Sequence, residues 1–256
     1  MIPKVIYISW VDKGILFESK NPLAINGVQN MKKINPKYKI EVSDDNDIDD
    51  YIQSCISNDD WLLIKDRHIV ERVDLWRLLK IYHEGGIYCD IDRLCNVPFD
   101  DIIREDDICI LPTHFNIDFS QDLMISCPKQ EIHKKAIELS MGRRRDGCKD
   151  VMSLGPISYF HAITMCLYGR QLNRFLHPAL WKKLLKSVDA HQGYRYFVEK
   201  PVENLQEHIT IIYKYSYKGH IYDTGNGENK EALYKESKIG HWTTAEDVFD
   251  KKLYGK

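Results

Sequence analysis

Two aspartates separated by a single residue are the feature of this sequence best suited to chemistry. Asp90 and Asp92 follow the apolar run Ile87–Cys89, which we expect to be a buried strand. In an open α/β sheet, ligands bind beyond the carboxyl ends of the strands, where this pair would lie. Two carboxylates at this spacing can hold one hard cation, Mg²⁺ or Mn²⁺, whose remaining ligands are usually water and substrate phosphates. The pattern therefore predicts a divalent-cation site.

A second polar pair lies in the helix expected just before that strand. Apolar residues recur with helical period from His68 to Glu84, and Gly85 supplies the residue that tolerates positive φ at the helix end. Asp74 falls inside the apolar arc, and Arg77 lies one turn later near its edge. A carboxylate among apolar neighbours loses hydration and needs a partner. Two interpretations stay open: an internal ion pair that fastens the helix, or two side chains that face a cavity and bind a polar ligand.

The elements that must position these residues alternate between strands and helices. The expected strands are Val5–Trp10, Tyr38–Val42, Ile87–Cys89, Ile108–Leu111, Leu123–Ser126 and Ile209–Tyr213. The expected helices are Asn21–Lys33, His68–Glu84, Glu131–Met141, Pro156–Tyr168 and Pro178–Val188. This alternation predicts an α/β layered fold with a largely parallel sheet flanked by helices.

The composition excludes several classes of protein. The chain has 256 residues, and 36 Lys and Arg stand against 38 Asp and Glu, so no basic excess favours nucleic-acid binding. No apolar run is long enough for a transmembrane segment, and we expect a cytoplasmic protein, with peripheral membrane association or the cytoplasm of an infected host cell as alternatives. The seven cysteines include no C-x-x-C pair and are expected to be reduced structural thiols.

Three segments together resemble a known family. Ile2–Trp10, Val73–Arg77 and Gly85–Asp92 are similar in order and spacing to the DXD-containing glycosyltransferases of family 32. That group is related to yeast initiating mannosyltransferases, capsular sugar transferases and the glucosylating domains of clostridial toxins. The resemblance covers roughly residues 2–100 and continues more faintly through Asp122–Pro128 and Gly155-Pro156.

The resemblance implies a single GT-A domain over residues 1–256, with a Rossmann-like sheet. Residues up to about 110 would form the nucleotide-sugar half, and residues from about 111 the acceptor side and a C-terminal lid. The implied activity is metal-dependent hexosyl transfer, with retention of configuration, from a nucleotide sugar, UDP- or GDP-linked, to a glycan or other hydroxyl acceptor. The implied cofactor is Mn²⁺ or Mg²⁺, and the implied role is surface or capsular polysaccharide biosynthesis.

The same resemblance assigns roles to individual residues. Asp90 and Asp92 would hold the metal and, through it, the donor diphosphate and ribose. Asp74 and Arg77 match an Asp-x-x-Arg that contacts the donor sugar and diphosphate, and with Asp92 they form the expected catalytic set. Asp74 is not assigned as a nucleophile.

Further donor contacts are expected at the ends of the first and third strands. Ser9 and Tyr88 are placed in the donor site, and Trp10 matches an aromatic position that packs on the donor base. A core aromatic is the alternative for Trp10. In the tail, His241 would be a third metal ligand and Trp242 a lid residue, although His-Trp-Thr departs from the family's usual His-then-Ser-Trp. A solvent-facing histidine is the alternative for His241.

Other interpretations of the motif remain. Phosphatases and phosphotransferases of the haloacid dehalogenase type also place D-x-D after a parallel strand, but they normally carry Thr or Val two residues further on, whereas Arg93-Leu94 follows Asp92 here. A non-catalytic sugar-nucleotide-binding protein is the other alternative, but it would have no chemical need for all four of the residues Asp74, Arg77, Asp90 and Asp92. The basic cluster Arg143–Arg145 is expected to be an exposed helix end, with recognition of an anionic acceptor or a membrane surface as alternatives.

Overall fold

The structure is a computed structural model that describes residues 1–16, 22–95, 97–114, 118–119, 121–169, 171, 185–189, 195–198, 209–212 and 221–223. The expected helix cap Asn21, the tail residues His241 and Trp242, and most of the expected helix 178–188 lie outside them.

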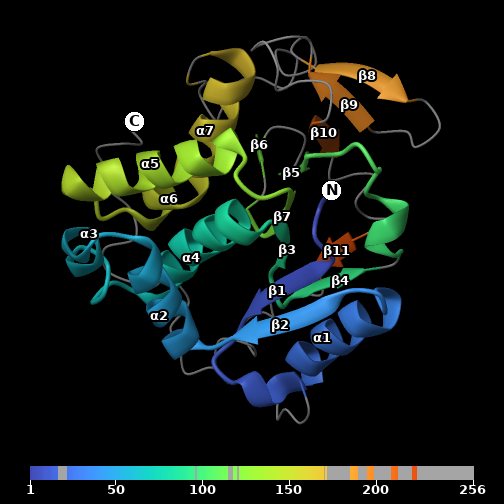
Figure 1. Cartoon of the computed structure of the whole chain (residues 1–256), viewed down its shortest axis with the longest axis horizontal. Helices are drawn as coiled ribbons and strands as arrows, with labels where there is room; N and C mark the ends of the chain where they lie inside the picture. The colour runs from blue at the N-terminus through green and yellow to red at the C-terminus, as the bar shows by residue number, and fades with distance from the viewer. Residues whose placement is uncertain are drawn as a thin grey trace.

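A mixed sheet, with both parallel and antiparallel strand pairs, forms the centre of the molecule (Figure 1). Its strands run in the order β2 (Lys39–Ser43), β1 (Val5–Ser9), β3 (Gly86–Cys89), β7 (Leu123–Ser126), β5 (Cys109–His114), β10 (Ile209–Ile212), β9 (Arg195–Val198) and β8 (Leu185–Asp189), and β6 (Asp118–Phe119) pairs with β5. β1 is parallel to β2 and β3, and β10 is parallel to β5, whereas β7 is antiparallel to both neighbours. The predicted α/β fold is confirmed.

The helices follow the local signals of the sequence. Their bounds are α1 (Pro22–Ile34), α2 (Asp45–Cys55), α3 (Asn58–Leu62), α4 (Ile69–Glu84), α5 (Glu131–Arg145), α6 (Val151–Leu154) and α7 (Pro156–Tyr168), with 3-10 turns at Lys13–Leu16 and Phe99–Asp101. His68 caps α4 by accepting a hydrogen bond from Val70 N, and Gly85 ends the helix at φ 67°. Side chains at Gly85 would also overlap the backbone of Pro128.

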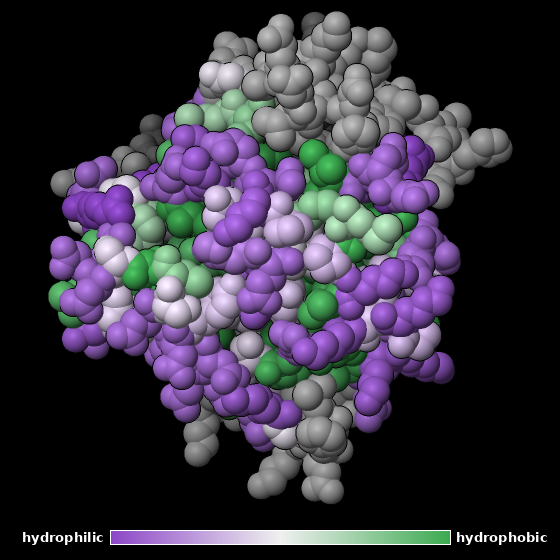
Figure 2. Space-filling model, viewed as in Figure 1, coloured by the Kyte–Doolittle hydropathy of each residue, from purple (hydrophilic) through white to green (hydrophobic). Residues whose placement is uncertain are grey.

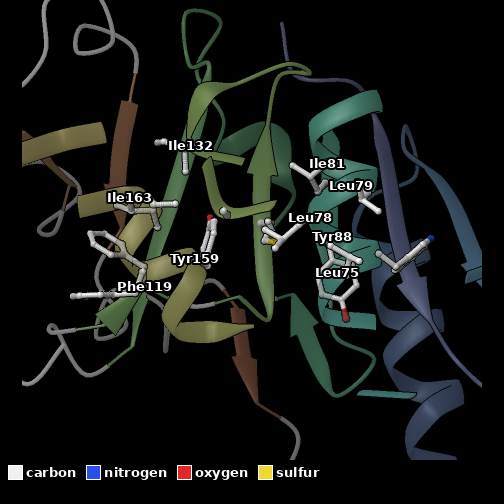
Figure 3. Packing of buried hydrophobic residues seen from close by; sticks show 14 of the residues in the cluster. Leu75, Leu78, Leu79, Ile81, Tyr88, Phe119, Ile132, Tyr159 and Ile163 are labelled. Carbon is white, nitrogen blue, oxygen red and sulfur yellow. The ribbon is translucent and has the colours of Figure 1, made fainter. Parts of the chain in front are cut away.

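The alternation of strand residues divides the core into two layers. Tyr7, Tyr88 and Met124 point to one face of the sheet, where they pack with α2, α4, α5 and α7. Figure 3 shows Leu75 and Leu78 of α4 in this layer with Tyr159 of α7. Their strand neighbours point to the opposite face, which is covered by α1 and by the segment around Phe99; these neighbours are Ile6, Ile8, Ile87, Cys89, Leu123 and Ile125. The site residues therefore stand on a sheet that is buried on both faces.

One predicted helix is wrong where the structure describes it. Residues 185–188, expected to end the helix Pro178–Val188, belong to β8. β8 pairs antiparallel with β9, in register Leu185 to Val198. Pairing between strands at the end of the sheet outweighs the local helical pattern, because β-structure depends on neighbours that lie elsewhere in the sequence.

The basic cluster is not the exposed helix end that we expected. Arg144 is 5% exposed and pairs with the buried Glu71 of α4 at 2.9 Å. Arg143 donates to Ser153 O at 2.5 Å, and only Arg145 remains largely exposed, paired with Asp60. The last turn of α5 packs against α4 and α6, so two of the three guanidinium groups serve internal polar partners.

Polar residues cover most of the described part of the face drawn in Figure 2. Among the described helices none is long and apolar enough to cross a bilayer.

Candidate active site

The Asp-x-Asp motif forms a tight turn at the end of β3. Arg93 N donates to Asp90 O at 3.0 Å, which closes the turn, and Asp90 N donates to Asp122 O at 2.8 Å. α1 rests directly on this turn, because a Cβ at Gly27 would overlap the carbonyl oxygen of Ile91. The turn is therefore held from the neighbouring strand on one side and from α1 on the other.

Arg77 joins the two polar pairs that the sequence singled out. Its guanidinium forms an ion pair with Asp74, one helical turn back, and Nη1 also donates to Asp90 Oδ1 at 3.3 Å and to Gln121 O at 3.0 Å. Asp74 is 2% exposed and Arg77 8%. The internal ion pair is confirmed, and Arg77 extends it to the Asp-x-Asp turn; ligand binding by the pair stays a prediction.

Tyr88 supports the same carboxylate from the strand. Its hydroxyl donates to Asp90 Oδ1 at 2.5 Å, its ring packs edge-on against Trp76, and the Arg77 guanidinium lies 5.1 Å from the ring centroid. Burial raises the pKa of Tyr88 well above its usual value, with the nearby Asp90 charge adding to the effect, so the phenol stays protonated as a donor. The Ser9 side chain lies beside the Tyr88 hydroxyl and interacts with it.

Trp10 stands directly after β1. Its backbone N–H donates to Ser43 O at 3.0 Å, and its half-buried ring packs at the margin of the layer covered by α1. This arrangement is compatible with both roles considered for Trp10, the core aromatic and the base-stacking ring. Ser9, Trp10 and Tyr88 all lie at the end of the sheet that carries Asp90.

Three residues of the site, Arg93, Gln121 and Asp122, were not found from the sequence. Asp122, just before β7, forms an ion pair with Arg93, which in turn lies 3.7 Å from Asp92. Gln121 is 5% exposed, and neither polar atom of its side chain has a hydrogen-bond partner among the residues that the structure describes. The only sequence signal was the faint resemblance over Asp122–Pro128, because the contacts between these residues and the turn cross from one strand to another.

The described residues form a site with an excess of negative charge. Four carboxylates, those of Asp74, Asp90, Asp92 and Asp122, share two guanidinium groups, those of Arg77 and Arg93, which leaves a formal charge of −2. Burial, together with the charges of Asp92 and Asp122, raises the pKa of Asp90 to about 6 against the opposing effect of Arg77. Repulsion of this kind is relieved by a cation.

A divalent cation fits this donor set. Asp90 and Asp92 offer hard oxygen ligands on one turn, and the charge of −2 matches that of Mg²⁺ or Mn²⁺. The described part of the chain contains no cluster of three or more acidic, histidine or cysteine side chains arranged around one metal position. Cations of this type commonly complete their coordination with water and substrate phosphates. Asp90 and Asp92 would therefore be this chain's contribution.

The C-terminal part of the chain returns to the same turn. β4 (Arg93–Cys95), which begins at the turn, pairs antiparallel with β11 (Ile221–Asp223), and the two strands lie side by side in Figure 1. Because the pair is antiparallel, β11 runs toward the Asp-x-Asp motif and ends opposite Arg93.

Comparisons with known proteins agree with this arrangement. Residues 23–109 match the model of the glycosyltransferase sugar-binding region containing a DXD motif, a range that includes Asp74, Arg77, Asp90 and Asp92. Among solved structures, the PaToxG glycosyltransferase is similar with a TM-score of 0.52 and 17% identity, over 65% of this chain and 70% of that chain. No curated protein matches the chain.

The structural likeness shows that the chain shares the fold of a glycosyltransferase, as the resemblance implied. With the family match, which spans roughly a third of the chain, it supports glycosyl transfer as the class of activity. Membership of family 32 stays a prediction.

Proposed function

We propose that this chain is a divalent-metal-dependent glycosyltransferase that moves a sugar from a nucleotide-sugar donor to a hydroxyl acceptor with retention of configuration. The observation that carries the proposal is the bridge made by Arg77 between buried Asp74 and Asp90 of the turn. It brings a cation, a buried carboxylate and the candidate metal ligands together at the carboxyl end of β3, where a diphosphate and its sugar would meet.

Each of these residues would stabilise one of the charges that develop in the reaction. Cleavage of the sugar–phosphate bond leaves negative charge on the diphosphate, and a metal held by Asp90 and Asp92 would neutralise part of it when bound. Arg77 would contact the same phosphates, where a fixed positive charge is most effective as the leaving group develops. Asp74 would face the sugar, whose oxocarbenium-like character is stabilised by a nearby anion.

Gln121 is proposed as a contact to the sugar hydroxyls. A buried amide without hydrogen bonds is costly, and a hydroxyl can both donate to its oxygen and accept from its nitrogen. Ser9, Trp10 and Tyr88 would line the nucleotide side. His241 and Trp242 are proposed as the third metal ligand and a lid, supported by the arrival of β11 at the turn.

We further propose a UDP- or GDP-sugar as donor, a glycan as acceptor, and a role in surface or capsular polysaccharide synthesis, in the cytoplasm or at a membrane surface. The support is the sequence resemblance.

A panel of UDP-, GDP-, CMP- and dTDP-sugars with Mn²⁺ tests the proposal. Thermal stabilisation and slow donor hydrolysis are both followed, with EDTA and Asp90→Asn as controls. A donor at about one hundred times its Kd should add about 2.7 kcal/mol of stability. One metal-dependent donor that the wild type hydrolyses and Asp90→Asn does not would support the proposal. Metal binding at Asp90 and Asp92 without any donor would favour phosphate-ester chemistry, and donor binding without turnover would favour a non-catalytic binding protein.

A further inference from the structure

Gly155 lies directly against the carboxylate of Asp74. It ends α6 and begins α7, and a Cβ at this position would overlap Asp74 Oδ2 and lie 2.7 Å from Cγ. The other carboxylate oxygen, Oδ1, faces the Arg77 guanidinium. Asp74 is therefore confined between Arg77 on its own helix and the backbone of Gly155 at the corner between α6 and α7.

Arg143 fixes the corner that carries Gly155. It donates to Ser153 O at 2.5 Å and to Ser158 Oγ at 2.9 Å, so one guanidinium spans residues on both sides of Gly155. Ser158 Oγ also donates to Ser153 O at 2.8 Å. At the other end of α6, the buried Asp150 accepts from Ser153 N at 3.1 Å and from Ser153 Oγ at 2.6 Å. The corner is closed by hydrogen bonds around Gly155.

Arg144, the next residue, fixes the helix that carries Asp74. Its Nη1 donates to Glu71 Oε2 at 2.9 Å, and both side chains are 2% exposed. Glu71 precedes Asp74 by one helical turn and is also paired with Arg67. At the end of α5, Arg144 thus holds α4, and Arg143 holds the corner between α6 and α7.

We propose that Gly155, held by Arg143, positions Asp74 for the sugar. Arg144 fixes α4, which carries Asp74, through its ion pair with Glu71. Only glycine fits, because any side chain would displace the carboxylate from Arg77. The N-terminus of α7 also favours a carboxylate at this place through its dipole. The role of Asp74 toward the sugar rests on the proposed function, whereas the packing of Gly155 on Asp74 does not.

A double-mutant cycle tests the packing in the ligand-free protein. Gly155→Ala should lower Tm by about 5 °C, because it inserts a methyl group into a filled space. In an Asp74→Ala background the nearest Asp74 atom would be Cβ, 3.1 Å away, so the same change should cost little. With Asp74→Asn, which keeps the shape, the full cost should remain. Gly142→Ala, at a helical glycine where the added Cβ would meet no described atom within 4 Å beyond its own helix backbone, should not lower Tm.

Ligand binding separates positioning from general damage. With Mn²⁺ present, Kd is measured for UDP and UDP-glucose and for GDP and GDP-mannose. Gly155→Ala should raise the Kd for the nucleotide sugar that the wild type binds by at least tenfold. The Kd for the matching nucleoside diphosphate should change by less than threefold. Equal weakening of sugar and diphosphate, or an equal loss of Tm in the Asp74→Ala background, would overturn the proposal. If Asp74→Ala does not fold, the proposal is judged by the ratio of the Kd for the nucleotide sugar to the Kd for the diphosphate in Gly155→Ala. Failure of both nucleotide sugars to bind the wild type would count against these donors, while the cycle would still judge the packing.

Discussion

Asp223, the last residue of β11, lies opposite Arg93 in the antiparallel pairing of β11 with β4. Arg93 is the first residue of β4 and directly follows the Asp-x-Asp motif. The chain therefore reaches the candidate metal turn shortly before the segment that contains His241 and Trp242. Arg93 and Asp223, far apart in the sequence, share this corner of the molecule.

His241→Ala should raise the Kd for Mn²⁺, measured by titration with UDP or GDP present, by at least about tenfold, because an imidazole ligand would be lost. His208→Ala serves as the matched control, since no role is proposed for His208. Equal metal affinity in wild type and His241→Ala would remove His241 from the site.

Asp92→Asn should abolish metal-dependent donor binding and leave the fold intact. The amide keeps the size of the side chain but is a poor ligand for a hard cation. Asp101→Asn, at an exposed position in the 3-10 turn Phe99–Asp101, is the control for the loss of one negative charge. Calorimetric titration with Mn²⁺ gives the answer, and an Asp92→Asn protein with wild-type metal affinity would defeat the assigned role.

Arg77→Lys should lower kcat by roughly 100-fold, because a lysine keeps the charge but cannot contact Asp74, Asp90 and Gln121 O together. Arg72→Lys, on the same helix and paired with Asp49, is the matched control and should keep its activity. Initial rates of donor hydrolysis at saturating Mn²⁺ measure both. A similar loss in the two variants would mean that Arg77 acts only through the stability of α4.

Gln121→Leu should stabilise the ligand-free protein and impair the enzyme. The buried amide has no hydrogen-bond partner among the described residues, so removing it relieves a cost of about 1–3 kcal/mol, and the same change removes the proposed contact to the sugar. Urea unfolding and the KM for the donor are measured on one preparation. Lower stability together with an unchanged KM would show that the amide is structural.

Because of His133, the free energy of unfolding should decrease as the pH is lowered below about 6.5. This ring is 0% exposed, stacks on Tyr159 and has no hydrogen-bond partner in the described part of the chain, and its burial lowers the pKa to about 3. Between pH 6.5 and 3 the unfolded chain binds a proton that the folded chain does not, so His133 lowers the free energy of unfolding by about 1.4 kcal/mol per pH unit.

His133→Leu removes this titration, so the difference in unfolding free energy between the variant and the wild type should grow steadily as the pH falls from 7 to 5. A difference that stays constant with pH would contradict a neutral buried imidazole.

The sequence by itself determined the strands and helices whose signals are local. The helix Ile69–Glu84 with its cap at Gly85, the strand before Asp90 and the burial of Asp74 all follow from periodicity, capping and the glycine pair. The Asp-x-Asp spacing likewise identified the candidate metal ligands, because both carboxylates lie on one turn of the chain.

Only the tertiary structure decided what these residues contact. Arg77 meets Asp90, Gly155 meets Asp74 and Arg144 meets Glu71 across elements whose packing no local pattern specifies. The helix expected up to Val188 ends as the strand Leu185–Asp189 for the same reason, since its pairing partner lies elsewhere in the sequence. Contacts between distant segments depend on how two faces fit together, and that information is spread over the whole chain.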